Sequence, residues 1–179
     1  MIMPGPETIR PALCERDARI RDNQNRVIAN MVAVPEPARS TIVTTGRVGE
    51  GLACTVTQGR FETRMDLGPG MGGDASAPSP GFYARAAIAG CVAIAVKMTA
   101  ARSGLSFREV NVEVATDFDD SALFGLGNAS AAPTETRLTI RIDSDEPRAE
   151  IDRLVARTLE MDPWFLALRD PQVVVVTVA

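Results

Sequence analysis

Six short stretches of the chain are rich in β-branched residues or alternate apolar with polar residues, and both patterns predict β-strands. They are residues 40–45, 52–57, 60–66, 109–118, 136–142 and 172–178. Turn-like connectors that contain glycine join the first three stretches, so we expect these strands to form an antiparallel meander.

Two longer segments show the signals of helices. A thin apolar stripe predicts a helix over residues 11–34, although its polar middle is poor in helix formers and permits a break. An almost wholly apolar segment predicts a second helix over residues 80–103, with Gly104 as its C-terminal cap. Because this second helix is apolar on all sides, we expect it to be buried.

The C-terminal third of the chain contains two helix starts. Pro147 begins a segment with apolar residues on one face, and Asp162-Pro163 is a capping residue followed by a first-turn proline. Strands, a buried helix, further strands and further helices in this order predict an α+β fold.

The apolar helix carries a single thiol, Cys91, about three turns after its start. Arg85 is the only charged residue between Pro80 and Val96, and we expect it to form an ion pair at an interface. A thiol buried in this way is either an inert small apolar side chain or a nucleophile in a dry pocket.

Bulk composition excludes several classes of protein. The 179 residues are 45% hydrophobic and 23% charged, which is typical of one globular domain. A net charge of -4 without a basic block argues against a nucleic-acid partner. The start of the chain has no apolar run typical of a secretory signal, and we find no apolar run long enough to span a membrane.

The side-chain inventory limits the chemistry further. The chain has no histidine, so serine triads and most cysteine-protease dyads are excluded and zinc loses its commonest ligand. The glycine-rich residues 68–73 do not join a strand to a helix and are interpreted as a loop, so no cofactor or metal is predicted. Three cysteines far apart in sequence favour reduced thiols in the cytosol over a disulfide framework.

The segment around the thiol resembles the OsmC/Ohr family of osmotically induced and organic-hydroperoxide-resistance proteins. The resemblance rests on Pro-Ser-Pro at residues 78–80, Ala-Ile-Ala-Gly-Cys at 87–91, residues 97–105 and the strand at 107–114. It implies an OsmC-like fold over residues 40–179, with antiparallel sheets around the cysteine-bearing helix and an intertwined homodimer. Residues 1–39 would then be an N-terminal helical extension.

The resemblance also assigns residues to a site for thiol-dependent reduction of organic hydroperoxides. Cys91 matches the attacking cysteine, and Arg47 resembles the arginine that activates it. Phe82 stands where the family has a glutamate, and Asp162 stands where it has a second, resolving cysteine. The usual two-cysteine cycle should therefore not run, and Asp162 would disfavour a thiolate if it lies near Cys91.

Two functions remain open from the sequence. In the first, Cys91 alone reduces a peroxide and an external thiol restores it. In the second, a catalytically impaired member binds a small apolar molecule in the pocket of its dimer. Cys14 and Cys54 are interpreted as structural or incidental, although either is a candidate for a displaced resolving thiol.

Overall fold

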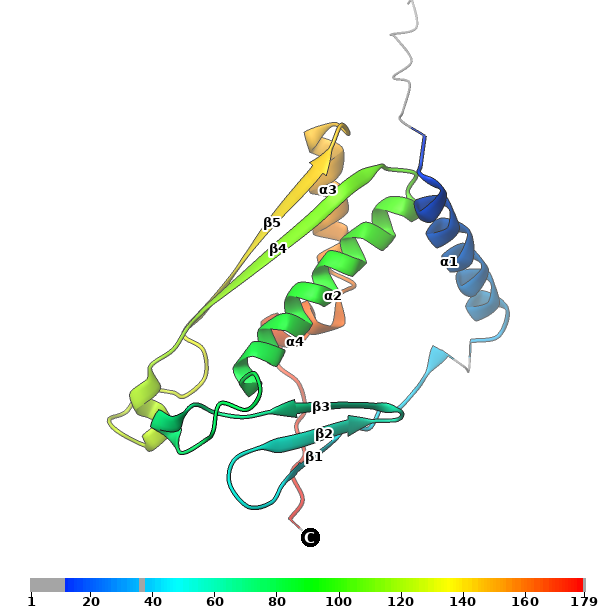
Figure 1. Ribbon diagram of the computed structural model, residues 1–179. Coiled ribbons are helices and arrows are strands. Elements are labelled where there is room, and N and C mark those ends of the chain that lie inside the picture. Colours follow the sequence, from blue (N-terminus) through cyan, green and yellow to red (C-terminus); the bar gives the residue numbers. More distant parts are fainter. Residues whose placement is uncertain (1–11, 36–37, 179) are drawn as a thin grey trace, which may run out of the picture. The chain divides into compact units, whose positions relative to one another are not determined.

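The computed structural model describes residues 12–35 and 38–178, and it shows an α+β chain (Figure 1). The helices and strands, in chain order, are α1 (Glu15–Ala33), β1 (Thr45–Val48), β2 (Cys54–Gln58), β3 (Phe61–Met65), η2 (Pro69–Met71), α2 (Pro80–Arg102), β4 (Phe107–Asp117), η3 (Asp120–Phe124), β5 (Glu135–Ser144), α3 (Arg148–Leu159) and α4 (Pro163–Arg169). They belong to two compact units, which are described separately: the small unit, residues 28–87, and the core unit, residues 1–27 with 88–179.

The small unit contains a three-stranded antiparallel meander in the order β1-β2-β3, as the sequence predicts. The prediction for the first strand is wrong in position, because β1 begins at Thr45 where residues 40–45 were expected. Thr45 pairs with Thr57, and β2 ends one residue later at Gln58. Thr44 comes opposite Gln58, and its hydroxyl donates a hydrogen bond to the Gln58 side chain. Residues 40–43 extend beyond the end of the strand that would have to pair with them.

The glycine-rich segment after β3 is a loop, as predicted, except that it includes the short 3-10 helix η2, and a buried carboxylate organises it. Asp66 accepts hydrogen bonds from the amides of Leu67, Asp74 and Ser76 and from the Ser76 hydroxyl. The bonds from Ser76, followed by those from the other two amides, lower the pKa of Asp66 to about 2. Gly73 is required here, since a Cβ atom would lie 2.1 Å from the Leu67 carbonyl oxygen.

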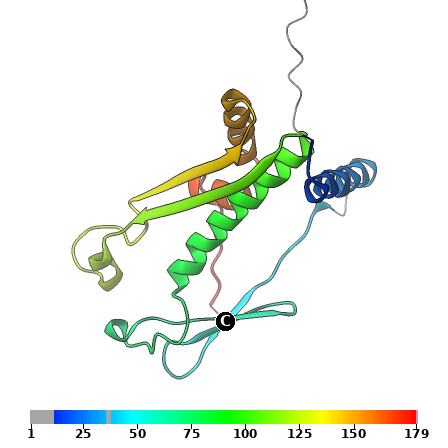
Figure 2. The same ribbon diagram turned by 45° about the horizontal axis from the view of Figure 1, so that its top comes forward.

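The core unit contains the two-stranded antiparallel sheet β4-β5 and the helices that pack on it. The alternation in both strands is confirmed, because every second residue, such as Val112 and its partner Ile140, faces the hydrophobic core. The buried members of this core are Val92, Val96, Ala100, Leu105, Phe107 and Leu154. Figures 1 and 2 show α2 and α3 on the same side of the two strands, so this face is the covered one.

Helix α2 ends at Arg102, and Gly104 caps it as predicted. Gly104 has a φ of +73°, a backbone conformation that is unfavourable for a residue with a side chain. Gly104 donates its amide hydrogen to Ala101 O and Leu105 donates to Ala100 O, which is the hydrogen-bond pair of a Schellman motif. This cap fixes the turn into β4, because Leu105 and Phe107 enter the core directly after it.

The prediction that α2 is buried on all sides is only partly correct. Val92, Val96, Thr99, Ala100 and Ala101 are buried, while other apolar residues of the same helix remain exposed. By length and composition α2 is also able to cross a membrane, contrary to our expectation, because the two charged side chains Arg85 and Lys97 do not offset the apolar majority. A core helix of a soluble protein has the same length and composition.

The remaining elements include one correction. Helix α1 runs without the break that its polar middle permitted, and α3 and α4 begin directly after Pro147 and Asp162 as predicted. Residues 172–178 form no strand in the described chain, and the side chains of their valines are largely exposed. A strand requires a hydrogen-bonded neighbour, which β-propensity alone does not supply.

Candidate active site

Cys91 lies about three turns after the start of α2, in the part of the helix that belongs to the core unit. Its side chain is half-buried and its thiol is free, while the neighbouring Val92 is fully buried. The helix thus places the sulfur at the margin of the hydrophobic core.

Asp162 approaches this thiol from the start of α4. It is the N-cap of that helix, and its Oδ1 accepts hydrogen bonds from the amides of Trp164 at 3.1 Å and Phe165 at 2.8 Å. Aspartate is a favoured capping residue and proline a favoured first residue, which explains why the sequence Asp162-Pro163 starts a helix here. Asp162 is nevertheless 0% exposed, which is unusual for a carboxylate.

The second oxygen of this carboxylate does not accept comparable hydrogen bonds. Asp162 Oδ2 is buried and lacks a hydrogen-bond partner of regular geometry among the described residues. A buried polar atom without a partner costs about 1–3 kcal/mol, and more when it carries charge. The site therefore contains an acceptor that a hydrogen-bond donor would stabilise.

The surroundings of Cys91 oppose its ionisation. Burial raises the pKa of the Cys91 thiol, and a hydrogen bond to the Asp162 carboxylate and the charge of that carboxylate raise it further. A hydrogen bond from the Trp164 backbone acts in the opposite direction and is the smallest of these effects. Cys91 is thus held as a neutral thiol near pH 7, as the sequence led us to expect if Asp162 lay nearby.

The other residues assigned through the resemblance lie in the small unit. Arg47 is on β1 opposite Thr55, with an exposed side chain, and its role beside Cys91 stays a prediction. Phe82 occupies the first turn of α2, where its ring meets that of Tyr83 edge to face. A phenyl ring cannot hold a guanidinium by hydrogen bonds, so Phe82 does not replace the family's glutamate.

The remaining cysteines show no sign of a second redox partner within their own units. Cys14 is exposed and Cys54 is half-buried on β2, and both are free. Arg85 is half-buried and forms no ion pair with a described residue, so its expected partner stays a prediction. Among the described residues, no group of three or more metal-ligating side chains occurs.

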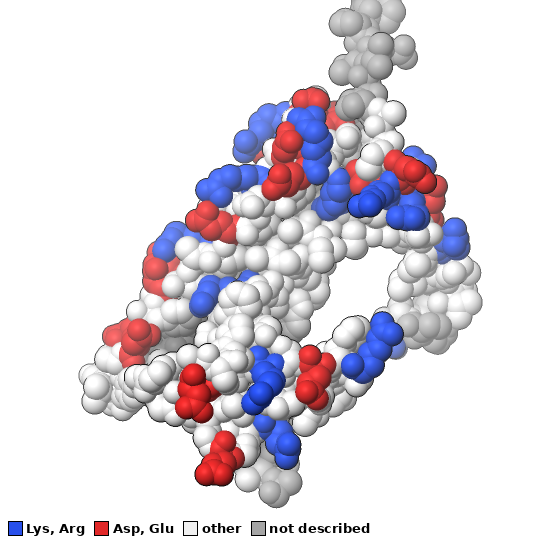
Figure 3. Space-filling view, in the orientation of Figure 1, with Lys and Arg blue, Asp and Glu red and all other residues white. Residues whose placement is uncertain are grey.

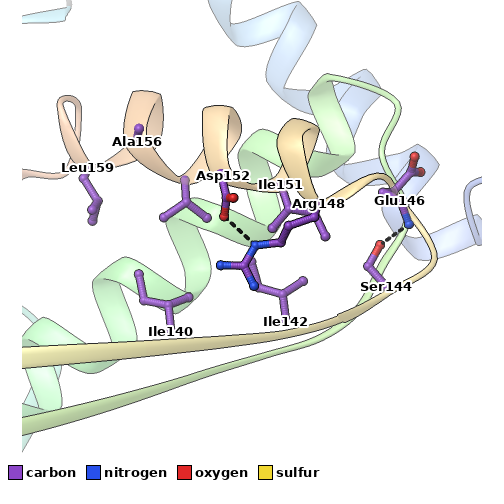
Figure 4. A pocket seen from close by; sticks show the side chains of 10 residues that line it. Ile140, Ile142, Ser144, Glu146, Arg148, Ile151, Asp152, Ala156 and Leu159 are labelled. Carbon is purple, nitrogen blue, oxygen red and sulfur yellow. Dashed lines mark hydrogen bonds and ion pairs between the residues drawn. The ribbon is translucent and has the colours of Figure 1, made fainter.

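A groove that the sequence did not indicate lies between β5 and α3 (Figure 4). It encloses about 540 Å³, and its apolar lining comes from Ile140, Ile142, Ile151, Val155 and Leu159. Arg148 and Asp152, which form an ion pair of 2.8 Å, also line the groove, and Cys91 does not. The sequence signals that could have indicated this groove were the alternating isoleucines of the strand and the apolar residues at helical spacing in α3.

An ion pair between a partly exposed lysine and a buried aspartate was also missed. Lys97 of α2 donates hydrogen bonds to Asp17 Oδ2 of α1, at 2.8 Å, and to the Phe107 carbonyl oxygen. Asp17 is buried, although it lies on an otherwise exposed helix. The pair fixes the first part of α1 to the core unit, and its two residues are 80 positions apart in sequence.

Acidic and basic side chains are interspersed on the face shown in Figure 3. The two strands of the core unit carry exposed ion pairs, since Arg108 of β4 binds Asp143 of β5 and Asp145, which follows β5 directly. Arg137 and Arg141 form similar exposed pairs with Asp117 and Glu113. Such pairs maintain a solvated strand face and contribute little stability individually.

The chain thus has an α+β fold in which a long apolar helix packs against an antiparallel sheet, and this helix carries a half-buried thiol. The model of the family described as OsmC-like protein matches residues 72–177, which include α2, both strands of the core unit, α3 and α4. The chain therefore belongs to the OsmC-like protein family. No curated protein matches the chain.

Solved structures share the fold at low identity. An OsmC-like protein from Mycoplasma pneumoniae is 16% identical with a TM-score of 0.62, covering 73% of this chain and 88% of that protein. Organic hydroperoxide resistance proteins from Elizabethkingia anophelis and Legionella pneumophila are 18% and 20% identical, with TM-scores of 0.54 and 0.50. Each match covers 73% of this chain. It covers 89% of the Elizabethkingia anophelis protein and 90% of the Legionella pneumophila protein.

Proposed function

We propose that this chain reduces organic hydroperoxides through Cys91 alone, with an external thiol as the reductant. The observation that carries the proposal is the position of Cys91 on α2 within the segment that matches the OsmC-like family. Two proteins of the same fold are described as organic hydroperoxide resistance proteins, which supports this class of substrate.

The proposed cycle has two balanced steps. The Cys91 sulfur attacks the terminal oxygen of ROOH, the O–O bond breaks, and the products are a sulfenic acid on Cys91 and the alcohol ROH. Two molecules of a small thiol then reduce the sulfenic acid, which yields the Cys91 thiol, water and a disulfide of the small thiol. An external reductant is required because Asp162, not a second cysteine, lies beside Cys91.

A second candidate function is binding without catalysis. The observation that favours it is the opposition of Asp162 to the thiolate, since the thiolate is the nucleophile in peroxide reduction. In this case the protein would hold a small apolar molecule in the pocket of a dimer, and Cys91 would be part of the wall.

One assay distinguishes the two functions. Purified protein is mixed with cumene hydroperoxide and a thiol reductant, beside C91S and, as a matched control, C54S. We expect wild type and C54S to consume peroxide and C91S to match the uncatalysed rate. Because the pKa of Cys91 is raised, the rate should still increase with pH above the range in which ordinary cysteines have ionised. Equal rates for wild type and C91S would favour the binding function.

We also propose that the chain forms a homodimer. Residues 172–178 are β-branched and exposed without a strand partner, and apolar side chains of α2 such as Ile94 remain uncovered. A second copy would supply both partners at once. The chain has a mass of 19.1 kDa, and sizing by light scattering should give twice that value. A value for one chain would contradict the dimer.

A further inference from the structure

We infer that the core unit contains a second ligand site, separate from Cys91, that binds the phosphate group of a small phosphorylated molecule. The site is a pocket of about 350 Å³ between the C-terminal end of α2 and helix α3. Thr99 lines it and follows Cys91 by eight residues, which is about 12 Å along the helix axis. The inference goes beyond the proposed function and does not depend on it. Two arginines, two hydroxyls and two leucines line the pocket: Arg153, Arg157, Thr99, Ser103, Leu105 and Leu154.

The two arginines of α3 supply the positive charge. Arg153 and Arg157 are exposed, and neither forms an ion pair or a hydrogen bond with a described residue. The arginines of the strands differ in this respect, since Arg108, Arg137 and Arg141 each bind a carboxylate. Residues four positions apart lie on one face of a helix, so the two like charges repel each other. An anion bound between them would remove this repulsion.

The end of α2 does not compete for these arginines. Arginine side chains near the C-terminus of a helix can bind its last carbonyl oxygens. In α2, however, the carbonyl oxygens of residues 99–101 already accept the amides of residues 103–105. The guanidinium groups therefore keep their donors for a ligand. Glu150 also lines the pocket, and the lining still carries two positive charges against one negative charge.

A buried hydroxyl points to a ligand independently of these charges. Thr99 is 6% exposed, and its Oγ1 forms no hydrogen bond with a described residue. Thr158, which is also buried, donates instead to the Leu154 carbonyl oxygen at 2.8 Å. Within the described chain, the side-chain oxygens that are sealed without a partner belong to Gln24 and Asp162. The Thr99 oxygen is therefore not sealed, and it opens on the pocket that Thr99 lines.

A phosphate monoester fits this arrangement. Arginine binds phosphate oxygens through two parallel hydrogen bonds, and a dianionic phosphate offers enough oxygens for two guanidinium groups. The hydroxyls of Thr99 and Ser103 can donate to the oxygens that remain. Leu105 and Leu154 give the rest of the molecule an apolar surface. Ligand pockets generally enclose about 300–1,000 Å³, so a volume of about 350 Å³ restricts the ligand to a small molecule.

Phenyl phosphate tests the inference on the full-length protein, because it joins a small apolar ring to a phosphate dianion. Isothermal titration calorimetry at constant ionic strength measures its binding. Phenol, which lacks the phosphate, and benzoate, which carries one carboxylate, are the comparison ligands. We expect phenyl phosphate to bind more tightly than either of them.

Variants locate the binding. R153Q/R157Q should weaken the binding of phenyl phosphate by about a hundredfold, because each charge-assisted hydrogen bond contributes about tenfold or more. T99V keeps the shape of the side chain, removes its hydroxyl and should weaken binding by about tenfold. R148Q is the matched control, since Arg148 lies on the same helix, is 86% exposed and does not line this pocket. It should bind as wild type does.

The inference is overturned if wild type does not bind phenyl phosphate at millimolar concentration, or if R153Q/R157Q binds it as tightly as wild type. Equal affinity for benzoate would contradict the choice of phosphate. C91S should bind phenyl phosphate as wild type does, and a loss of binding in C91S would contradict a separate site. If wild type consumes no peroxide but binds phenyl phosphate, the proposed function fails and the inference stands.

Discussion

Replacing Phe107 with alanine is expected to lower the free energy of unfolding by about 3–5 kcal/mol. Phe107 is 0% exposed and lies in the hydrophobic core with Val92, Val96 and Leu154. The substitution removes the apolar area of the ring and leaves a cavity that the sheet and α2 only partly fill. Urea unfolding followed by circular dichroism measures the change.

Phe61→Ala is the matched control for this prediction. Phe61 lies on β3 and is 66% exposed, so the same truncation should change the unfolding free energy by less than about 1 kcal/mol. Equal losses in the two variants would show that the core does not lie where the structure places it.

Replacing Lys97 with methionine is expected to destabilise the fold by about 3 kcal/mol. The substitution keeps most of the length of the side chain but removes the charge that offsets the buried carboxylate of Asp17, at 2.8 Å. It also removes the donor to the Phe107 carbonyl oxygen. Asp17 is then left buried without its partner, which is the costly outcome.

A double variant separates charge from packing. Adding D17N to K97M removes the unpaired charge, so much of the lost stability should return. Arg148→Met breaks an ion pair whose arginine is 86% exposed and should change stability by less than about 1 kcal/mol. If D17N/K97M is as unstable as K97M alone, the ion pair with Asp17 does not explain the effect.

The elements that the sequence predicted well are those with local causes. Asp162 and Pro163 start α4 through contacts within four residues, and Gly104 ends α2 through its own φ angle. The alternation in β4 and β5 reports which side chains face the core, and this holds whichever strand is the neighbour. Each of these signals can be recognised from a few neighbouring residues in the sequence.

The features that were missed or wrong depend on partners distant in sequence. Residues 172–178 have the composition of a strand, but no neighbour within the described chain forms hydrogen bonds with them. The ion pair between Asp17 and Lys97 joins two helices whose spacing no local pattern encodes. For the candidate site, the resemblance pointed to Cys91, Arg47 and Asp162, whose roles stay predictions, and the structure added the burial of Asp162 and its effect on the pKa of the thiol.

A single side chain at position 162 both caps α4 and raises the pKa of Cys91, and this restricts how the protein can evolve. Asp162 starts α4 through Oδ1 and acts on Cys91 through the same carboxylate. A mutation to cysteine would create a second thiol beside Cys91, but it would remove a helix cap worth about 1 kcal/mol. Lineages that exchange one chemistry for the other must therefore pass through a less stable helix start or acquire a compensating change first.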